Sequence, residues 1–196
     1  MSFMKKAVLL GDSIRLQGYG TRVPSLLAPD ISVWQSDDNG RFTSYTLRTC
    51  FEYRPELETA DVIHWNNGLW DMCDLFGDGP FTSLPVYTES LVRIARILLS
   101  YCPRVIFATT TPPRPEMWGH SLERVREYNA AAIDVLRPLG VRINDLYGLV
   151  APDINRFIRE DDLLHLTDEG IEKAAEQVAR SIRDALRDAL RDALAD

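Results

Sequence analysis

Cysteine and histidine are scarce in this 196-residue chain, which has three of each. The cysteines, Cys50, Cys73 and Cys102, lie far apart, and none belongs to a Cys-x-x-Cys pair. This spacing disfavours both a disulfide framework and a zinc site. The sequence therefore predicts reduced, partly buried thiols, no bound metal and a cytoplasmic protein.

The chain also lacks a basic stripe and a long apolar run. It carries 22 Lys and Arg against 29 Asp and Glu, a net charge of −7, which disfavours nucleic acid and anionic membranes as partners. Its first apolar stretch, residues 7–10, is too short for the core of a signal peptide, and no stretch is long enough to span a bilayer. We expect one soluble domain over residues 1–196.

Two glycine motifs are missing as well. No Gly-x-x-x-x-Gly-Lys-Ser/Thr sequence is present, which disfavours a loop that holds nucleotide phosphates. No Gly-x-Ser-x-Gly sequence is present either, which disfavours the nucleophile elbow of the α/β-hydrolases.

Short apolar runs alternate with stretches of helical periodicity. We expect buried parallel strands at residues 7–10, 31–34, 62–65, 105–109 and 141–144. We expect long helices at residues 83–101, 121–136 and 167–194, and shorter ones at 21–27 and 44–53. This alternation predicts an α/β protein with three layers, in which helices cover both faces of a five-stranded parallel sheet.

The last predicted helix contains the repeat Arg-Asp-Ala-Leu three times, over residues 183–194. A four-residue repeat turns by about 400° on a helix, so its leucine stripe drifts by about 40° with each repeat. We expect this amphipathic helix to pack on the sheet. An oligomer contact through its final turns is the alternative.

Gly11-Asp12-Ser13 follows the first predicted strand directly. Ligands of a parallel sheet bind at the carboxyl ends of its strands, so a serine at this point can present its hydroxyl and its N–H to a ligand. Gly, Asp and Ser also favour turns and helix caps, and the tripeptide alone is more often a structural cap than a nucleophile.

Near the other end of the chain, Asp162 precedes His165 by three residues. A histidine that acts as a base needs one ring nitrogen free for the proton and the other held by an acceptor. Asp162 is placed to be that acceptor, with Asp161 and Asp168 as alternatives. A loop histidine beside a helix start, capped by Thr167 or Asp168, is the structural interpretation.

A third polar group, Asn66-Asn67-Gly68, follows the strand expected at residues 62–65. An amide at the edge that also carries Ser13 suits the stabilisation of an oxyanion.

Together these motifs resemble the SGNH, or GDSL-type, hydrolases, a superfamily of esterases, lipases, thioesterases and carbohydrate deacetylases. Gly11-Asp12-Ser13 matches its first block, and Asp162-x-x-His165 matches its last. The resemblance covers most of the chain and implies a flavodoxin-like sheet of five strands. It also implies a triad in which Ser13 is the nucleophile, His165 the base and Asp162 the group that orients the base.

The middle blocks depart from the family pattern. Its Gly-x-Asn-Asp block corresponds here to residues 64–67, in which Asn66 keeps the oxyanion donor while His64 and Asn67 replace the glycine and the aspartate. This indicates a variant branch. The resemblance further implies a backbone N–H donor after the second strand, for which Gly40 is the candidate and Arg41 the alternative. The implied oxyanion hole is thus Ser13, Gly40 and Asn66.

The implied activity is that of a serine esterase that forms an acyl-enzyme and needs no cofactor. Its partner would be a small ester with a short acyl group, above all acetyl, including acetylated carbohydrates. Aromatic side chains expected near the site, which fit either packing or substrate contact, are Trp70, Phe76, Phe81 and Trp118. An acyltransferase with the same triad and a non-catalytic small-ligand module are the competing interpretations.

Overall fold

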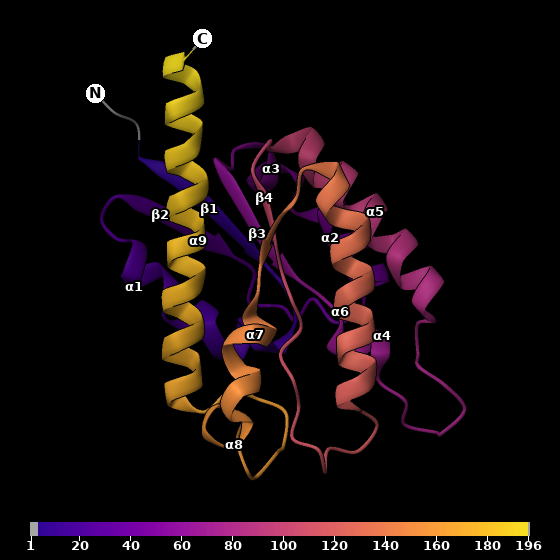
Figure 1. Ribbon diagram of the computed structural model, residues 1–196. Helices are drawn as coiled ribbons and strands as arrows, with labels where there is room; N and C mark the ends of the chain where they lie inside the picture. Colours follow the sequence, from indigo (N-terminus) through magenta and orange to yellow (C-terminus); the bar gives the residue numbers. More distant parts are fainter. Residues whose placement is uncertain (1–3, 196) are drawn as a thin grey trace.

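The computed structural model describes the backbone of residues 4–195 and the side chains of residues 4–188. Five parallel strands form one sheet in the order β2-β1-β3-β4-β5 (Figure 1). The strands are β1 (Lys5–Leu10), β2 (Ile31–Gln35), β3 (Val62–Asn66), β4 (Val105–Ala108) and β5 (Arg142–Asn144).

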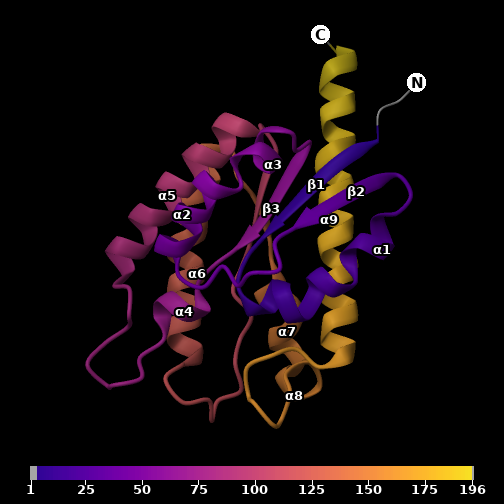
Figure 2. The same cartoon turned by 180° about the vertical axis from the view of Figure 1, so that it is seen from behind.

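Helices cover both faces of the sheet, and the two opposite views agree on which helices lie on which side (Figures 1 and 2). One side carries α1 (Val23–Leu27), α7 (Leu146–Val150), α8 (Ile154–Phe157) and α9 (Asp168–Ala195). The other side carries α2 (Thr43–Glu52), α3 (Arg54–Glu58), α5 (Leu84–Tyr101) and α6 (Leu122–Leu136). The short elements are η1 (Ile14–Gly18), η2 (Tyr19–Thr21), α4 (Leu69–Met72), η3 (Arg137–Leu139) and η4 (Ala151–Asp153).

Side-chain alternation along β1 supplies both halves of the core. Ala7 and Leu9 are buried against the α9 side, whereas Val8 and Leu10 are buried against the α5 and α6 side. Because helices cover both faces of the sheet, residues 7–10 of β1 are buried on both sides and form a continuous apolar run after Lys5 and Lys6.

The strand order places a switch point beside β1. From β1 the chain crosses to β2 at one edge, then returns past β1 to β3 and continues to β4 and β5. The loops after β1 and β3 therefore diverge, and they leave a crevice at the carboxyl ends of the strands. The residues after Leu10 and the end of β3 at Asn66 meet at this crevice.

The expected three-layer α/β fold with a five-stranded parallel sheet is confirmed. Each expected element is present, with ends that differ by at most two residues, as at β1, which begins at Lys5. The sequence did not predict the short helices between β5 and α9, because pieces of four or five residues do not complete a periodic apolar pattern.

Helix α9 begins beside the site and extends beyond the end of the sheet (Figure 1). The Thr167 hydroxyl accepts the N–H of Gly170 at 3.1 Å and caps the helix, as the structural interpretation of this segment expected. The last two leucines of the repeat, Leu190 and Leu194, lie outside the described side chains, so an oligomer contact there stays a prediction. No helix within residues 4–195 combines the length and apolarity needed to cross a bilayer.

Candidate active site

Ser13 lies just past the end of β1, where the chain turns into η1. Gly11 makes the turn possible: its φ is +153°, and a Cβ on it would stand 1.9 Å from the Asn66 Oδ1 atom. Only glycine tolerates both that backbone angle and that approach. The turn leaves Ser13 only 6% exposed, with its hydroxyl at the crevice.

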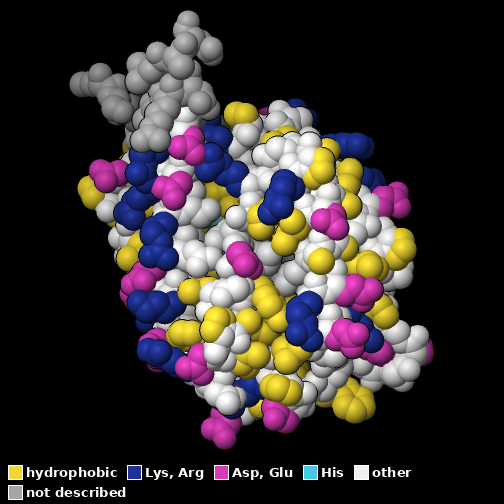
Figure 3. Space-filling view, in the orientation of Figure 1, with side chains coloured by type: hydrophobic (Ala, Val, Ile, Leu, Met, Phe, Trp, Pro, Cys, Tyr) yellow, Lys and Arg dark blue, Asp and Glu magenta, His cyan; other side chains and the backbone are white. Residues whose placement is uncertain are grey.

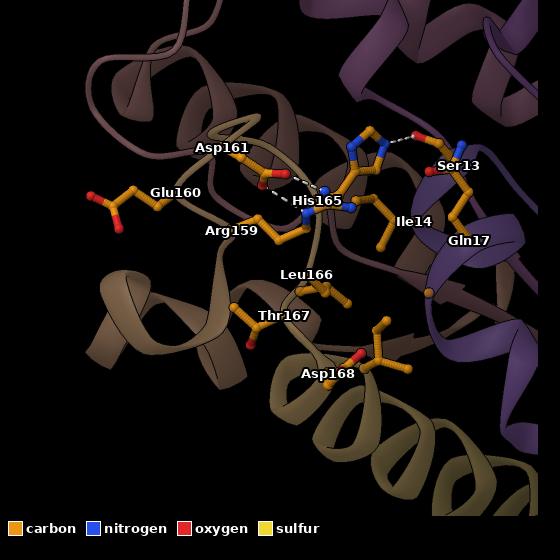
Figure 4. Close-up of a pocket in the computed structure, with 12 residues that line it drawn as sticks. Ser13, Ile14, Gln17, Arg159, Glu160, Asp161, His165, Leu166, Thr167 and Asp168 are labelled. Atoms are coloured by element: carbon orange, nitrogen blue, oxygen red, sulfur yellow. Dashed lines mark hydrogen bonds and ion pairs between the residues drawn. The ribbon is translucent and has the colours of Figure 1, made fainter.

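His165 reaches Ser13 from the far end of the chain. Its Nε2 atom lies 2.9 Å from the Ser13 Oγ atom, and its Nδ1 atom lies 2.9 Å from the Asp162 Oδ2 atom. The close-up shows the imidazole directed at the Ser13 hydroxyl (Figure 4). Of the three carboxylates considered from the sequence, Asp161 is instead paired with Arg159, and Asp168 begins α9. The structure thus brings Ser13, His165 and Asp162 into one hydrogen-bonded row.

The Asp162 carboxylate is held as an anion by its own loop. Burial alone would raise its pKa, but the N–H groups of His165 and Leu164 and the His165 imidazole outweigh that effect and lower the pKa. Its Oδ1 atom accepts both N–H groups, at 2.9 and 3.0 Å. Leu163, which lies between Asp162 and Leu164, adopts a left-handed φ of +62°, and the tight turn lets Oδ2 of Asp162 meet the imidazole.

Two arginines tie this loop to the body of the protein. The Arg114 N–H donates to the Leu163 carbonyl at 2.8 Å, and its guanidinium donates to the carbonyl of Ile158 from two nitrogens. The Arg159 N–H donates to the His165 carbonyl at 2.8 Å. The guanidinium of Arg114 is thus occupied by main-chain carbonyls of the protein itself.

Asn66 ends β3 with its amide fully oriented. The Tyr19 hydroxyl donates to Asn66 Oδ1 at 2.8 Å, and the Asn66 Nδ2 atom donates to Asp12 Oδ1 at 2.8 Å. Tyr19 is itself buried and stands edge-on to the His64 ring, with the ring centroids 5.4 Å apart. Since an amide nitrogen carries two hydrogens, one N–H of Asn66 is left for another acceptor.

A buried polar network lies beneath Ser13. Asp12 is 1% exposed; burial raises its pKa, and its Oδ2 atom has no hydrogen-bond partner among the described residues. Arg15, also 1% exposed, donates to the main-chain carbonyls of Gly11, Ser36 and Asp38. One guanidinium therefore joins the turn after β1 to the loop after β2, and the multiple charged donors fix both backbones.

Gly40 does not have the free N–H that the sequence prediction requires. The group donates to the Gly11 carbonyl at 2.9 Å, and the N–H of the alternative, Arg41, donates to Asn39 Oδ1 at 2.9 Å. Gly40 approaches Gly11 so closely that a Cβ on it would lie 2.7 Å from the Gly11 oxygen. Gly40 thus acts as a close-packing position between the two loops. Asn67 braces the same loop by donating to the Arg41 carbonyl at 3.0 Å.

Two cavities open on the Ser13–His165 pair. The charged cavity, of about 650 Å³, is drawn in Figure 4 and has in its wall Gln17, Arg159, Asp161, Thr167, Asp168 and Ile171. The aromatic cavity, of about 310 Å³, is lined mainly by Leu69, Trp70, Cys73, Leu75, Phe81 and Leu164. Of the four aromatic residues expected near the site, Trp70 and Phe81 line this cavity.

Exposed apolar side chains continue outward from the aromatic cavity. Phe76 is 80% exposed and stands edge-on to Phe81, with the ring centroids 6.2 Å apart. Phe42 contacts the rings of both Trp70 and Phe81. On the face seen in Figure 3, hydrophobic side chains gather toward the end to which the strands point, whereas charged side chains alternate along α9. Exposed apolar side chains therefore border the crevice on the side of the aromatic cavity.

A second buried carboxylate, Asp71, supports the loop after β2. It accepts the N–H and the hydroxyl of Thr43, the first residue of α2. Burial raises the pKa of Asp71 to about 6 against the bonds from Thr43, which lower it. Asp71 thus fixes the start of the helix that follows Gly40.

The three cysteines are buried and unpaired, as expected. Burial also lowers the pKa of His64 to about 3, so this histidine is neutral, and its Nε2 atom lies 3.1 Å from Asn144 Nδ2. Within residues 4–188, no group of three or more His, Cys, Asp or Glu side chains is arranged to hold a metal ion.

Sequence reasoning did not identify Tyr19 or Arg15 as parts of the site. Arg15 lies two residues after Ser13 on a short helical turn, but nothing in its neighbours marks it as buried. Tyr19 precedes Gly20 in a polar segment, and its contact with Asn66 spans 47 residues. Only the packed structure reveals such partners.

Comparison with known proteins finds this architecture in solved structures. The sequence matches no protein-family model and no curated protein. A lipase/acylhydrolase from Enterococcus faecalis is 22% identical, with a TM-score of 0.77 over 92% of this chain and 96% of its own. The acetylxylan esterase Axe2 from Geobacillus stearothermophilus is 15% identical, with a TM-score of 0.73 over 91% of this chain and 94% of its own.

A third similar structure is a member of the lipolytic G-D-S-L family from Veillonella parvula. It is 15% identical, with a TM-score of 0.69 over 90% of this chain and 97% of its own. These likenesses extend over nearly the whole length of each protein. The chain has the fold of the GDSL-type lipases and acetylxylan esterases.

Proposed function

We propose that this protein is a serine ester hydrolase with Ser13, His165 and Asp162 as its catalytic triad. The observation that carries the proposal is the hydrogen-bonded row from Ser13 Oγ through the imidazole to Asp162, with both distances at 2.9 Å. Within such a row the serine is activated by an adjacent base, and the base is oriented by a third group. The similar folds of lipases and acetylxylan esterases support the same chemistry.

The mechanism has two steps. Ser13 Oγ attacks the ester carbon while His165 Nε2 takes its proton, and Asp162 stabilises the imidazolium that results. The tetrahedral intermediate collapses, the C–O bond to the alcohol breaks, and His165 returns the proton to the departing oxygen. Water then attacks the acyl-enzyme by the same route, which releases the acid and restores Ser13.

The negative oxygen of each intermediate requires donors already in place. We assign this role to the Ser13 N–H and to the remaining N–H of the Asn66 amide, whose other hydrogen is held by Asp12 and whose oxygen is held by Tyr19. A third donation, from Gly40, would require its N–H to share the bond that it makes to Gly11.

For the substrate we propose esters with a short acyl group, above all O-acetyl esters, including those of carbohydrates. Two observations support this substrate class, one on the cavity and one on solved structures with the same fold. The aromatic cavity, about 310 Å³, is at the small end of the range for ligand pockets. Two proteins of the same fold, Axe2 and a second enzyme, AlAXEase, are acetylxylan esterases.

The test is release of p-nitrophenol from p-nitrophenyl acetate, butyrate and longer esters. Ser13→Ala and His165→Ala should each lose at least about 10³-fold in kcat, since triad members act as a unit. Ser25→Ala, at an exposed serine on α1, is the matched control and should retain full activity. A fluorophosphonate should add one mass label to the wild type and none to Ser13→Ala.

Equal activity in the wild type and Ser13→Ala would overturn the proposal. Product analysis with added glycerol separates the competing acyltransferase, because that enzyme would form glyceryl acetate in place of acetic acid. Retained binding of an ester with no turnover would instead favour the non-catalytic module.

A further inference from the structure

We infer that the two cavities divide the ester between them: the aromatic cavity holds the acyl group, and the charged cavity holds a neutral, polyhydroxylated alcohol. This inference rests on the proposed ester hydrolysis and assigns subsites to it. Its first basis is that both cavities share Ser13, Gln17 and His165, whereas charged side chains gather in the rest of one wall and apolar side chains in the rest of the other.

The position of His165 decides which cavity receives the alcohol and which receives the acyl group. The alcohol oxygen must leave beside His165 Nε2, which returns its proton. The charged cavity is built largely from the loop that carries this histidine, through Arg159, Asp161 and Thr167. The alcohol therefore departs into the charged cavity.

The acyl group then occupies the other side of the carbonyl carbon. There the wall comes from the loops after β2 and β3, with Asn39 next to Gly40 and with Leu69 and Trp70 shortly after Asn66. The second of these loops begins directly after Asn66, the proposed oxyanion donor. An apolar acyl chain loses its contact with water in this cavity, which favours binding in proportion to the area buried.

The charged cavity suits a different group. Its wall offers acceptors and donors together: the Glu160 and Asp168 carboxylates, the Gln17 amide, which also borders the aromatic cavity, and the Arg159 guanidinium, which is already paired with Asp161 (Figure 4). A mixed wall of this kind matches hydroxyl groups, which both donate and accept, better than it matches an anion or a long apolar alcohol. Its volume of about 650 Å³ exceeds that of the aromatic cavity.

Matched variants that fill one cavity at a time test the assignment. Leu75→Trp fills the aromatic cavity and Ile171→Trp fills the charged one; both positions are partly exposed aliphatic residues in the respective walls. Acyl length is varied with p-nitrophenyl acetate, butyrate, hexanoate and octanoate. Alcohol size is varied with the acetates of methanol, glycerol and glucose, with acetic acid release followed by titration.

Leu75→Trp should lower kcat/KM for the hexanoate and octanoate at least about 10-fold relative to the acetate, since one methylene in a pocket is worth about 10-fold or more. It should leave the ranking of the three alcohols unchanged. Ile171→Trp should lower kcat/KM for glucose acetate about 10-fold relative to methyl acetate and should leave the acyl profile unchanged. Trp70→Ala enlarges the aromatic cavity and should raise kcat/KM for the longer acyl chains relative to the acetate. It replaces Leu75→Trp as the test if that variant does not fold.

The opposite pattern, in which Ile171→Trp changes the acyl profile and Leu75→Trp or Trp70→Ala changes the alcohol ranking, would overturn the assignment while leaving ester hydrolysis intact. A uniform effect on both series would overturn it too. A wild type no more active on any of these esters than Ser13→Ala would instead overturn the proposed function itself.

Discussion

The two halves of the candidate site are built in different ways. On the Ser13 side, Asp12, Arg15, Tyr19 and Asn66 are all at most 4% exposed and bonded to one another or to main chain. On the His165 side, the Asp162 side chain is 32% exposed and lies on a surface loop. The buried half derives its precision from packing, whereas the loop half derives it from a few main-chain hydrogen bonds.

This difference predicts a division between activity and stability. A change on the loop half removes a catalytic group while the core stays intact, because few buried contacts depend on it. A change on the buried half leaves polar partners unsatisfied in the core, which lowers the free energy of unfolding as well as the rate.

The largest effect on activity with an intact fold is expected from Asp162→Asn. An amide at this position disturbs the imidazole tautomer, and the corresponding change in a serine-protease triad lowers kcat by about 10⁴-fold. We expect a loss of about 10³–10⁴-fold in kcat and little change in the melting temperature. Asp161→Asn, one residue away and paired only with Arg159, should retain most of the activity. A comparable loss in Asp161→Asn would show that Asp162 is not the carboxylate that orients the histidine.

Asn66→Ala should come next, with a loss of about 10²–10³-fold in kcat, as is typical for removal of an oxyanion donor. Unlike Asp162→Asn, it should also lower the free energy of unfolding, because Asp12 and Tyr19 each lose a buried partner. Unchanged stability in this variant would contradict the contrast between the two halves.

Tyr19→Phe should lower kcat by about 10-fold with KM nearly constant, since the hydroxyl orients Asn66 and does not touch substrate. If Tyr19 acts through Asn66, the Tyr19→Phe and Asn66→Ala double variant should be no slower than Asn66→Ala alone. Tyr128→Phe is the matched control, since this buried tyrosine donates to the Thr82 carbonyl at 2.7 Å. If the losses of the two single variants add up in the double variant, Tyr19 does not act through Asn66.

The smallest effect on activity, and a measurable one on stability, is expected from Asp71→Asn. The pKa of Asp71 in the fold, about 6, lies above the usual 3.8, so the folded state holds its proton more tightly than the unfolded state does. The stability it contributes is therefore fully present below about pH 4 and is lost as the pH rises through 6. Two pKa units correspond to about 3 kcal/mol.

Denaturant unfolding of both proteins between pH 4 and pH 7 measures this term. The wild type should lose up to about 3 kcal/mol of unfolding free energy relative to Asp71→Asn over that interval. A difference between the two proteins that stays constant with pH would show that Asp71 ionises normally, and one that grows in favour of the wild type would show that folding lowers its pKa; either result would contradict this prediction.

The sequence was sufficient to predict the elements of the sheet because their signal is local. Residues 7–10 are apolar throughout, and residues 62–65 are apolar except for His64, as is typical of strands covered on both faces. The pairing of Ser13 with His165 was predicted through the resemblance to the SGNH hydrolases, because each of the two short motifs alone also fits a structural role. The order of strands then brings the two ends of the chain together.

What could not be predicted depends on directions that only packing sets. A glycine after β2 was foreseen at the site, but whether the Gly40 N–H faces the crevice or the Gly11 carbonyl is decided by how two loops meet. Arg15 looks like an ordinary surface arginine in the sequence, yet it is buried because three main-chain carbonyls converge on its guanidinium. Neither the direction of the Gly40 N–H nor the burial of Arg15 produces a periodic pattern in the sequence.

The bond between Ser13 and His165 joins residues 152 positions apart, and this makes ester turnover a reporter of chain assembly. A chain cut in the exposed segment around Gly119 would give one piece with the serine and both oxyanion donors and another with the histidine and its carboxylate. Neither piece alone has a complete set of groups for the reaction. Recovery of activity on mixing would therefore follow the docking of β5 and α9 onto the rest of the sheet, the step that encloses the site.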